Sequence, residues 1–511
     1  MILSTSLFII VLDNTILNVA VPTIIRQFHT QVSSMQWVIS GYSLVFASLL
    51  ISFGRLGDIF GRRKLFLFGV VVFGASSAFI GFSQSEAWLV TGRAVQGIGA
   101  AFMMPATLSI ISNAFPPHER GKAIGTWAGV SAMALAIGPV VGGFLVENVS
   151  WQSIFFLNLP VAAIAVVVTL FATHESRDET APRTVDYAGV TTITVGLASL
   201  VLALVESNAW GWGSARILGL LAFAAIALTA FAIVERRIAN PMVDFKFFRS
   251  RSFAGANLVA FIVSFAMLAT FFFFALYLQN VRGYSPLQAG VRFLPMTVII
   301  IIAGPISGRL SDKIGPRPLM TAGLLLNAIS LFWQGHLTVD TPYTNLLGAF
   351  VLMGLGMGLV MSPMSTAAMN AVDPTKAGVA SGVLSMSRMV GGTFGVAAMG
   401  ALITGLGRSK IDETLPQLPE SARHGLAEGL GTGATGGSGA VHDAVQSAFL
   451  YALNDGLRIA AVVAVLGAVA AWTLIEAGIP KRQPVHDAES SEVGTGDGGS
   501  ELAAAAETAL A

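Results

Sequence analysis

The sequence predicts an all-α membrane protein with about fourteen transmembrane helices. Hydrophobic residues make up 54% of its 511 residues and charged residues only 11%, against roughly 25% charged in an ordinary soluble domain. Apolar runs of about 20 residues, long enough to cross a hydrocarbon core of about 30 Å, recur along nearly the whole chain. Barrel strands would alternate polar and apolar residues in shorter segments, so these runs are interpreted as helices spanning a lipid bilayer.

Short polar loops bound each predicted span. The spans cover residues 2–25, 36–56, 64–83, 87–113, 121–147, 151–172, 185–205, 214–235, 252–280, 288–308, 317–336, 343–369, 378–406 and 456–478. The first span contains Asp13 and Asn18 and has no basic residue before it, unlike a signal peptide. It is barely long enough to cross, so we expect the given sequence to lack a basic cytoplasmic arm.

Lysine and arginine gather in alternate loops, and such loops stay in the cytoplasm. This pattern predicts a multi-pass protein of a bacterial inner membrane with both termini cytoplasmic. Tryptophan prefers the membrane interface, and Trp37, Trp88, Trp151, Trp210 and Trp333 fall at the outer ends of predicted helices, which supports the same topology.

Composition and motifs exclude several other classes of protein. A formal net charge of +1 offers no basic surface for nucleic acid, and the absence of cysteine removes disulfides and thiolate chemistry. Histidines are scattered without metal-ligand spacing, and no nucleotide-binding GxxxxGK motif occurs. The stretch Gly431 to Gly436 matches a dinucleotide fingerprint, but it follows no predicted strand. We therefore expect no enzyme activity, metal, cofactor or nucleotide, and an ion gradient as the energy source.

An internal repeat divides the chain. The segment GRLGDIFGRRK at 54–64 returns as GRLSDKIGPRP at 308–318, with Gly, Arg, Leu, Asp, Gly and Arg in register. We expect a six-helix bundle at 1–172, two inserted helices with a cytoplasmic linker at 173–251, and a second six-helix bundle at 252–480. The second bundle should carry an extracellular loop at 407–455, and residues 481–511 form a disordered cytoplasmic tail. Repeated bundles with a site at their interface are typical of alternating-access transporters.

The repeat resembles the signature of the major facilitator superfamily. Three further motifs, LDNTILNVAVP, RAVQGIGAAFMMP and IGPVVGG, resemble those of fourteen-span drug:proton antiporters of the EmrB/QacA type. The resemblance covers essentially residues 1–480. It implies a major facilitator fold, and the motif of Gly138, Pro139, Gly142 and Gly143 in the fifth helix implies export, since antiporters of this superfamily carry it. Its small residues let a neighbouring helix approach closely.

Asp13 is the candidate proton-coupling residue, because no other acid lies at mid-depth in any predicted helix. An ionised carboxylate is costly to bury there, so a proton should bind and leave as water reaches it from alternate sides. The alternative is a structural Asp permanently paired with an arginine. The resemblance assigns a role in proton transfer to Arg93, with packing beside Gln96 as the alternative.

Asp58 is the centre of a predicted conformational gate. It lies at the cytoplasmic end of its helix, where the helix dipole disfavours an anion, so it needs Arg62, Arg63 or a helix N-terminus of the other half. The family's motif is interpreted as such a latch, flanked by Gly54 and Gly61. Asp312, with Arg309 and Arg317, is expected to form a weaker second latch.

The substrate chamber should lie between the two halves. Candidate lining residues are polar or arginine side chains and the Phe and Met residues that suit apolar or cationic aromatic ligands: Asn18, Gln96, Asn257, Phe271, Phe274, Met357, Met361 and Arg388. For Arg388, snorkelling or pairing with carbonyls is the other interpretation.

Three functions remain open. Proton-coupled export of hydrophobic or cationic small molecules such as drugs, antiseptics and antibiotics leads. Export of one endogenous product, such as an antibiotic, lipid or amino acid, follows, and a non-transporting membrane sensor is third.

Overall fold

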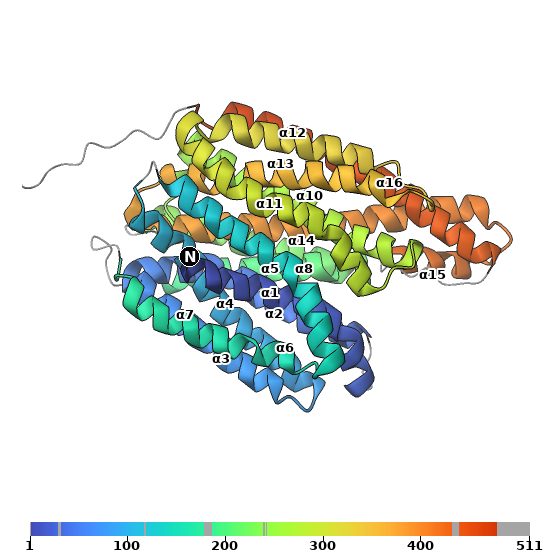
Figure 1. The fold of residues 1–511 in the computed structure, drawn as a ribbon, viewed down its shortest axis with the longest axis horizontal. Coiled ribbons are helices and arrows are strands. Elements are labelled where there is room, and N and C mark those ends of the chain that lie inside the picture. The colour runs from blue at the N-terminus through green and yellow to red at the C-terminus, as the bar shows by residue number, and fades with distance from the viewer. Residues whose placement is uncertain are drawn as a thin grey trace, which may run out of the picture. The chain divides into compact units, whose positions relative to one another are not determined.

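The computed structural model describes residues 2–28, 32–116, 119–177, 186–238, 241, 243–431 and 439–477, and all secondary structure within these ranges is helical (Figure 1). The predicted tail at 481–511 lies outside the described residues.

The helices follow the predicted spans. In the N-terminal part they are α1 (Ile2–Phe28), α2 (Val32–Phe60), α3 (Arg62–Gly81), α4 (Glu86–Ala114), α5 (Arg120–Asn148), the short α6 (Ser153–Phe156) and α7 (Asn158–Ala172). The inserted pair is α8 (Tyr187–Trp210) and α9 (Ala215–Arg237), followed by the one-turn η1 (Phe245–Arg249). The C-terminal part holds α10 (Arg251–Leu276), η2 (Tyr277–Val281), α11 (Pro286–Ile314), α12 (Pro316–Gln334), α13 (Tyr343–Asn370), η3 (Pro374–Lys376), α14 (Ala377–Thr414), α15 (Glu420–Gly431) and α16 (Ala440–Leu474).

Every one of the predicted spans coincides with a helix or, for 151–172, with the pair α6 and α7. By length and composition, 11 helices among the described residues could cross a membrane. The remaining three predicted spans fall on α1, α5 and α12, which are helical but are not among those 11. The all-helical membrane fold is therefore confirmed, while three of the predicted crossings rest on position in the bundle.

Local sequence signals set several helix starts. Ser85, Ser214 and Ser285 each accept a hydrogen bond from a backbone N–H of the following turn, and Asp186 does the same for α8. At α11 the Gln288 side chain accepts a hydrogen bond from the Ser285 backbone N–H, which completes a capping box. These caps satisfy donors that would be costly to leave unpaired at a membrane interface.

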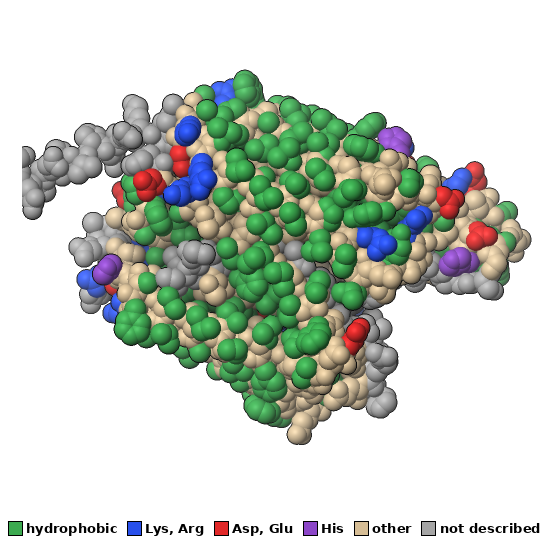
Figure 2. Space-filling model, viewed as in Figure 1, with side chains coloured by type: hydrophobic (Ala, Val, Ile, Leu, Met, Phe, Trp, Pro, Cys, Tyr) green, Lys and Arg blue, Asp and Glu red, His purple; other side chains and the backbone are tan. Residues whose placement is uncertain are grey.

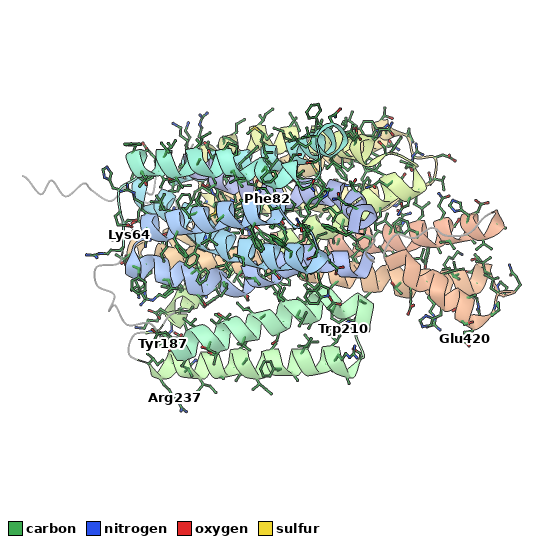
Figure 3. All side chains as sticks on the ribbon, turned by 90° about the horizontal axis from the view of Figure 1, so that it is seen from below. Lys64, Phe82, Tyr187, Trp210, Arg237 and Glu420 are labelled. Atoms are coloured by element: carbon green, nitrogen blue, oxygen red, sulfur yellow. The ribbon has the colours of Figure 1, made fainter. Side chains whose placement is uncertain are left out.

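The inserted helices α8 and α9 pack against each other, and α8 also contacts α2 and α14. Figure 3 shows this pair along one side of the other helices, with Tyr187 and Arg237 at the same end as Lys64 and with Trp210 at the other end. We call the end marked by Lys64 and Arg237 the basic end. Glu420 lies beyond Trp210 in the direction away from the basic end (Figure 3).

The surface is that of a protein in lipid. Large apolar side chains are exposed on several helices, including Phe171 at 88%, Ile226 at 68% and Leu466 at 60%. Figure 2 shows hydrophobic side chains across the middle of one face, with most charged groups toward its two ends. Burying such a band in a bilayer removes an apolar surface that water would disfavour.

The segment 407–455, predicted as a long loop, is mainly helical where it is described. Helix α14 continues to Thr414, α15 covers Glu420–Gly431, and α16 starts at Ala440 rather than near 456. Leu430 packs at the position of Gly407, and an ion pair between Arg423 and Asp412 joins α15 to α14 at 2.7 Å. The Gly content suggested a loop, but Ala favours a helix, and these tertiary contacts stabilise the helices further.

The two halves meet along α2 with α14 and along α5 with α11. Glycines allow both contacts near the basic end. A Cβ on Gly54 would lie 2.5 Å from the carbonyl oxygen of Gly378, and one on Gly125 would lie 2.7 Å from that of Gly304. These backbones approach so closely that no side chain fits between them, and glycine is therefore required where the two halves contact each other.

Candidate proton site and gate

Asp13 lies buried on α1, with 4% of its surface exposed, and side chains of two other helices, α4 and α7, contact its carboxylate. Arg93 of α4 forms an ion pair with Oδ2. Gln96 of α4 donates to Oδ1 at 3.1 Å, and Asn158 at the start of α7 donates to the same oxygen at 2.7 Å. One cation and two amides thus contact the carboxylate.

Arg93 is itself fully enclosed. Its guanidinium donates to the Val38 carbonyl at 3.2 Å, to the Asn14 side chain at 3.2 Å and to Gln96 at 2.6 Å, and it lies over the Tyr42 ring at 4.2 Å. These contacts fix the position of the Arg93 guanidinium. The predicted contact between Asp13 and Arg93 is therefore present, while its role in proton transfer stays a prediction.

Sequence reasoning missed Asn158 and Ser77. Ser77 of α3 accepts hydrogen bonds from Gln96 at 2.8 Å and from Asn158 at 3.2 Å, and so orients both amides toward Asp13. A buried Asn inside the apolar run 151–172 was the one available signal, because a polar amide within a span needs a partner.

Asp58 is completely buried at the basic end of α2 and joins the two halves. Arg62 donates to its Oδ1 from Nε at 2.8 Å and from Nη2 at 2.6 Å. The backbone N–H groups of Gly378 and Val379, at the start of α14, donate at 2.9 Å each. Arg62 also donates to the carbonyls of Pro374 and Thr375. The Asp58 carboxylate thus occupies the N-terminus of a helix from the other half, and Arg62 contacts the turn before that helix.

Arg63 has a different role from Arg62. It donates to the Leu170 carbonyl at 2.6 Å, and its backbone N–H donates to Glu175 at 3.0 Å. Glu175, which the sequence did not single out, caps the first turn of α3 and lies against Gly61. Gly61 has φ 114°, a conformation that favours glycine. Of the predicted gate residues, Arg63 and Gly61 therefore shape the turn between α2 and α3.

Asp312 makes the matching contact in the other direction. From α11 it accepts the backbone N–H groups of Gly121 at 3.1 Å and Lys122 at 3.2 Å, at the start of α5. Gly308 abuts Gly121 as Gly54 abuts Gly378. The repeat found in the sequence thus produces two matching carboxylate contacts between the halves, and their role as latches stays a prediction.

The two arginines predicted to accompany Asp312 have the following surroundings. Arg317 stacks over the Trp472 ring at 4.1 Å, and Arg309 is exposed at the surface. The turn that precedes α14 is stabilised by Asp373, which accepts the backbone N–H of Thr375 at 2.9 Å and its hydroxyl at 2.7 Å. These hydrogen bonds lower the pKa of Asp373.

Two of the glycines in the α5 motif pack against α1, close to Asp13. Any Cβ on Gly138 would overlap the hydroxyl of Thr15, and one on Gly142 would lie 3.1 Å from Ile16. The expectation of close approach is wrong for Gly143, whose Cβ position has no described neighbour within 4 Å, because this glycine points away from α1. The side chain of Pro139 lies outside the described residues.

The residues predicted for the substrate chamber separate into two groups. Gln96, Phe274 and Met357 are at most 1% exposed and Asn257 is 6% exposed, so in this conformation they belong to the packed interior. Asn257 accepts the Ser387 hydroxyl at 3.0 Å and links α10 to α14. The half-buried side chains are those of Phe271, Met361 and Arg388. Nothing is described for the side chain of Asn18.

Asp58 is buried and Asp312 is partly buried, and each lies at the start of a helix from the opposite half. Together with the Asp13 network between α1, α4 and α7, they define a two-bundle membrane transporter. The chain belongs to the Major Facilitator Superfamily, whose family model matches residues 3–396. It is a multi-pass membrane protein of that family.

Relatives of similar length carry transport and resistance names. The chain is 33% identical over 498 residues to the tetracenomycin C resistance and export protein of Streptomyces glaucescens, covering 94% of this chain and 92% of that protein. It is 36% identical over 433 residues to the multidrug resistance protein Stp of Mycobacterium tuberculosis, covering 83% and 79%. The solved structure of the proton:xylose symporter XylE superposes with a TM-score of 0.61 at 12% identity, covering 93% and 94%.

Proposed function

We propose that this chain exports drug-like small molecules from a bacterial cell across the inner membrane, in exchange for protons, by alternating access. The observation that carries the proposal is the buried network around Asp13, which offers a single titratable group at mid-depth. The resistance and export names of its relatives support the direction of transport and the class of substrate.

The proposed cycle uses Asp13 as the proton carrier. In the ionised state it is compensated by Arg93 and by two amides. Binding of a proton cancels that compensation and leaves the Arg93 cation without its counter-ion, which favours rearrangement of α1 against α4. No cofactor is needed, because one charge crossing the membrane contributes roughly 2.3 kcal/mol per 100 mV.

In the proposed topology the basic end faces the cytoplasm, with both termini there. Both latches then close the cytoplasmic side, and the structure corresponds to a conformation that is shut toward the cytoplasm. Release of the two latches would open the chamber to substrate inside the cell.

The test is transport into inverted membrane vesicles energised to be acid inside. Asp13→Asn keeps the size of the side chain but cannot titrate, so we expect uphill uptake of a compound panel and substrate-induced proton release to disappear while the protein stays folded. The panel includes tetracenomycin C, puromycin and a cationic dye. Uphill uptake by the Asn variant would contradict the role of Asp13, and uptake of a single compound by the wild type would indicate a dedicated exporter.

A further inference from the structure

Arg388 is a cation at mid-membrane depth that the proton site and the latches do not use. It lies eleven residues after the start of α14, or about 16 Å along the helix axis, near the middle of a core of about 30 Å. Either membrane surface is farther away than an arginine side chain extends, so snorkelling does not account for it.

No described residue accepts a hydrogen bond from Arg388 or forms an ion pair with it, and pairing with carbonyls is thereby excluded within the described part of the chain. The acids of neighbouring helices either pair with other residues or lie far along their helix. Asp13 is bound by Arg93, Asp58 is bound by Arg62 and by the start of α14, and Glu206 lies near the far end of α8 from the basic end. Arg388 therefore adds a net positive charge to the middle of the bundle.

The one described partner of the Arg388 side chain is aromatic. Its guanidinium carbon lies 5.6 Å from the centre of the Trp127 ring, which belongs to α5 in the other half. The Trp127 indole N–H donates to Thr107 at 3.3 Å, and this bond holds the ring in place. Arg388 of α14 and Trp127 of α5 thus place a cation and an aromatic ring together between the halves.

A half-buried arginine at this depth in the membrane is costly unless a ligand supplies the anion. We propose that Arg388 binds the acidic group of the transported substrate and Trp127 packs against its ring, so that the preferred substrates are aromatic anions: carboxylates, phenolates or sulfonates. The inference rests on the proposed export function and names its substrate class. It departs from the expectation of cationic ligands, because the Asp13 carboxylate that could serve as their counter-charge is already bound by Arg93, Gln96 and Asn158.

The test compares two xanthene dyes of similar ring system and opposite charge, anionic fluorescein and cationic tetramethylrhodamine methyl ester. Binding to the purified full chain is measured by fluorescence anisotropy, which needs no proton gradient. We expect wild-type protein to bind fluorescein more tightly, and Arg388→Gln to weaken fluorescein binding by about 10- to 100-fold through loss of a charge-assisted hydrogen bond. Cation binding should be unchanged or stronger.

Two further variants separate a specific role from general damage. Arg388→Lys keeps the charge and should retain most of the fluorescein affinity. Arg458→Gln removes a charge of the same kind from an exposed site, where Arg458 pairs with Asp455, and should leave both dyes unaffected. Equal fluorescein binding by wild type and Arg388→Gln, or no fluorescein binding by the wild type, would overturn the inference. Vesicles that fail to move either dye uphill despite selective binding would instead refute the export function.

Discussion

Substitution of Asp58 by Asn should shift the protein out of the conformation described here. The carboxylate accepts four hydrogen bonds, two from Arg62 and two from the start of α14, and it is completely buried. When the halves separate at the basic end these groups reach water, so the loss falls on the joined conformation alone. Removing one partner of a buried ion pair costs about 3–5 kcal/mol. Because Asn keeps one acceptor oxygen, we expect a loss of about 3 kcal/mol. This loss corresponds to a roughly hundredfold decrease in the ratio of molecules whose halves are in contact at the basic end to molecules whose halves are apart there.

The chain has no cysteine, so spin labels can be attached to introduced cysteines without background. Labels at Phe60 and Ile314, both 45% exposed, report on the basic end, and labels at Gln84 and Thr344 report on the opposite end. In Asp58→Asn the distance distribution between Phe60 and Ile314 should lengthen. Asp455→Asn, at a half-buried position that pairs only within α16, is the matched control. Unchanged distributions at both ends of a folded Asp58→Asn protein would refute the assignment of Asp58 as a latch.

Two further predictions concern packing and pH. In Gly138→Val the new side chain should overlap Thr15, lower the free energy of unfolding by about 1–3 kcal/mol and reduce transport. Gly143→Val should be nearly neutral, because no described atom lies within 4 Å of its Cβ position. Equal melting temperatures for the two variants would contradict the contact between α5 and α1. Asp373→Ala should lower the free energy of unfolding by about 0.5–1 kcal/mol at neutral pH. The pKa of Asp373 is lowered in the folded state, so its contribution to stability is complete above its unfolded-state pKa of 3.8 and is lost as pH falls through the lower folded-state pKa. Denaturation curves of wild type and Asp373→Ala should therefore converge in strong acid.

The sequence predicted the helices because a chain crossing lipid must hydrogen-bond its own backbone, which a helix achieves. Such a helix needs about 20 mostly apolar residues, and runs of this length are visible in the sequence. It predicted Asp13 by elimination, since one acid at mid-depth needs a reason. The partner Asn158 is 145 residues away in sequence, and only the packing of α7 beside α1 brings it to the carboxylate. Such a contact leaves no local pattern.

The gate shows the same limit. The need of Asp58 for a helix N-terminus followed from its place at a helix end, but which helix supplies it depended on how the halves dock. Glu175 was missed because an acid in a loop is ordinarily solvated, and its role as a cap on α3 appears only when the chain folds back beside Gly61. The helices in 407–455 were missed because their stability comes from contacts rather than composition.

One helix connects the proton site to a latch. Helix α5 holds Asp312 at its first turn, through Gly121 and Lys122. It contacts α1 at Gly138, where Thr15 lies two residues beyond Asp13. The distance along the helix from Gly121 to Gly138 is about 26 Å, and a packed helix over that length moves as a rigid body.

A change in the position of α1 therefore acts at both ends of α5. In the proposed cycle, protonation of Asp13 would weaken its pairing with Arg93, and α5 would follow α1, since no side chain lies between them at the glycine contact. The first turn of α5 then changes its position relative to the Asp312 carboxylate, whose hydrogen bonds depend on direction. Coupling between proton and gate thus requires no separate pathway of side chains, because the same helix contributes to both sites.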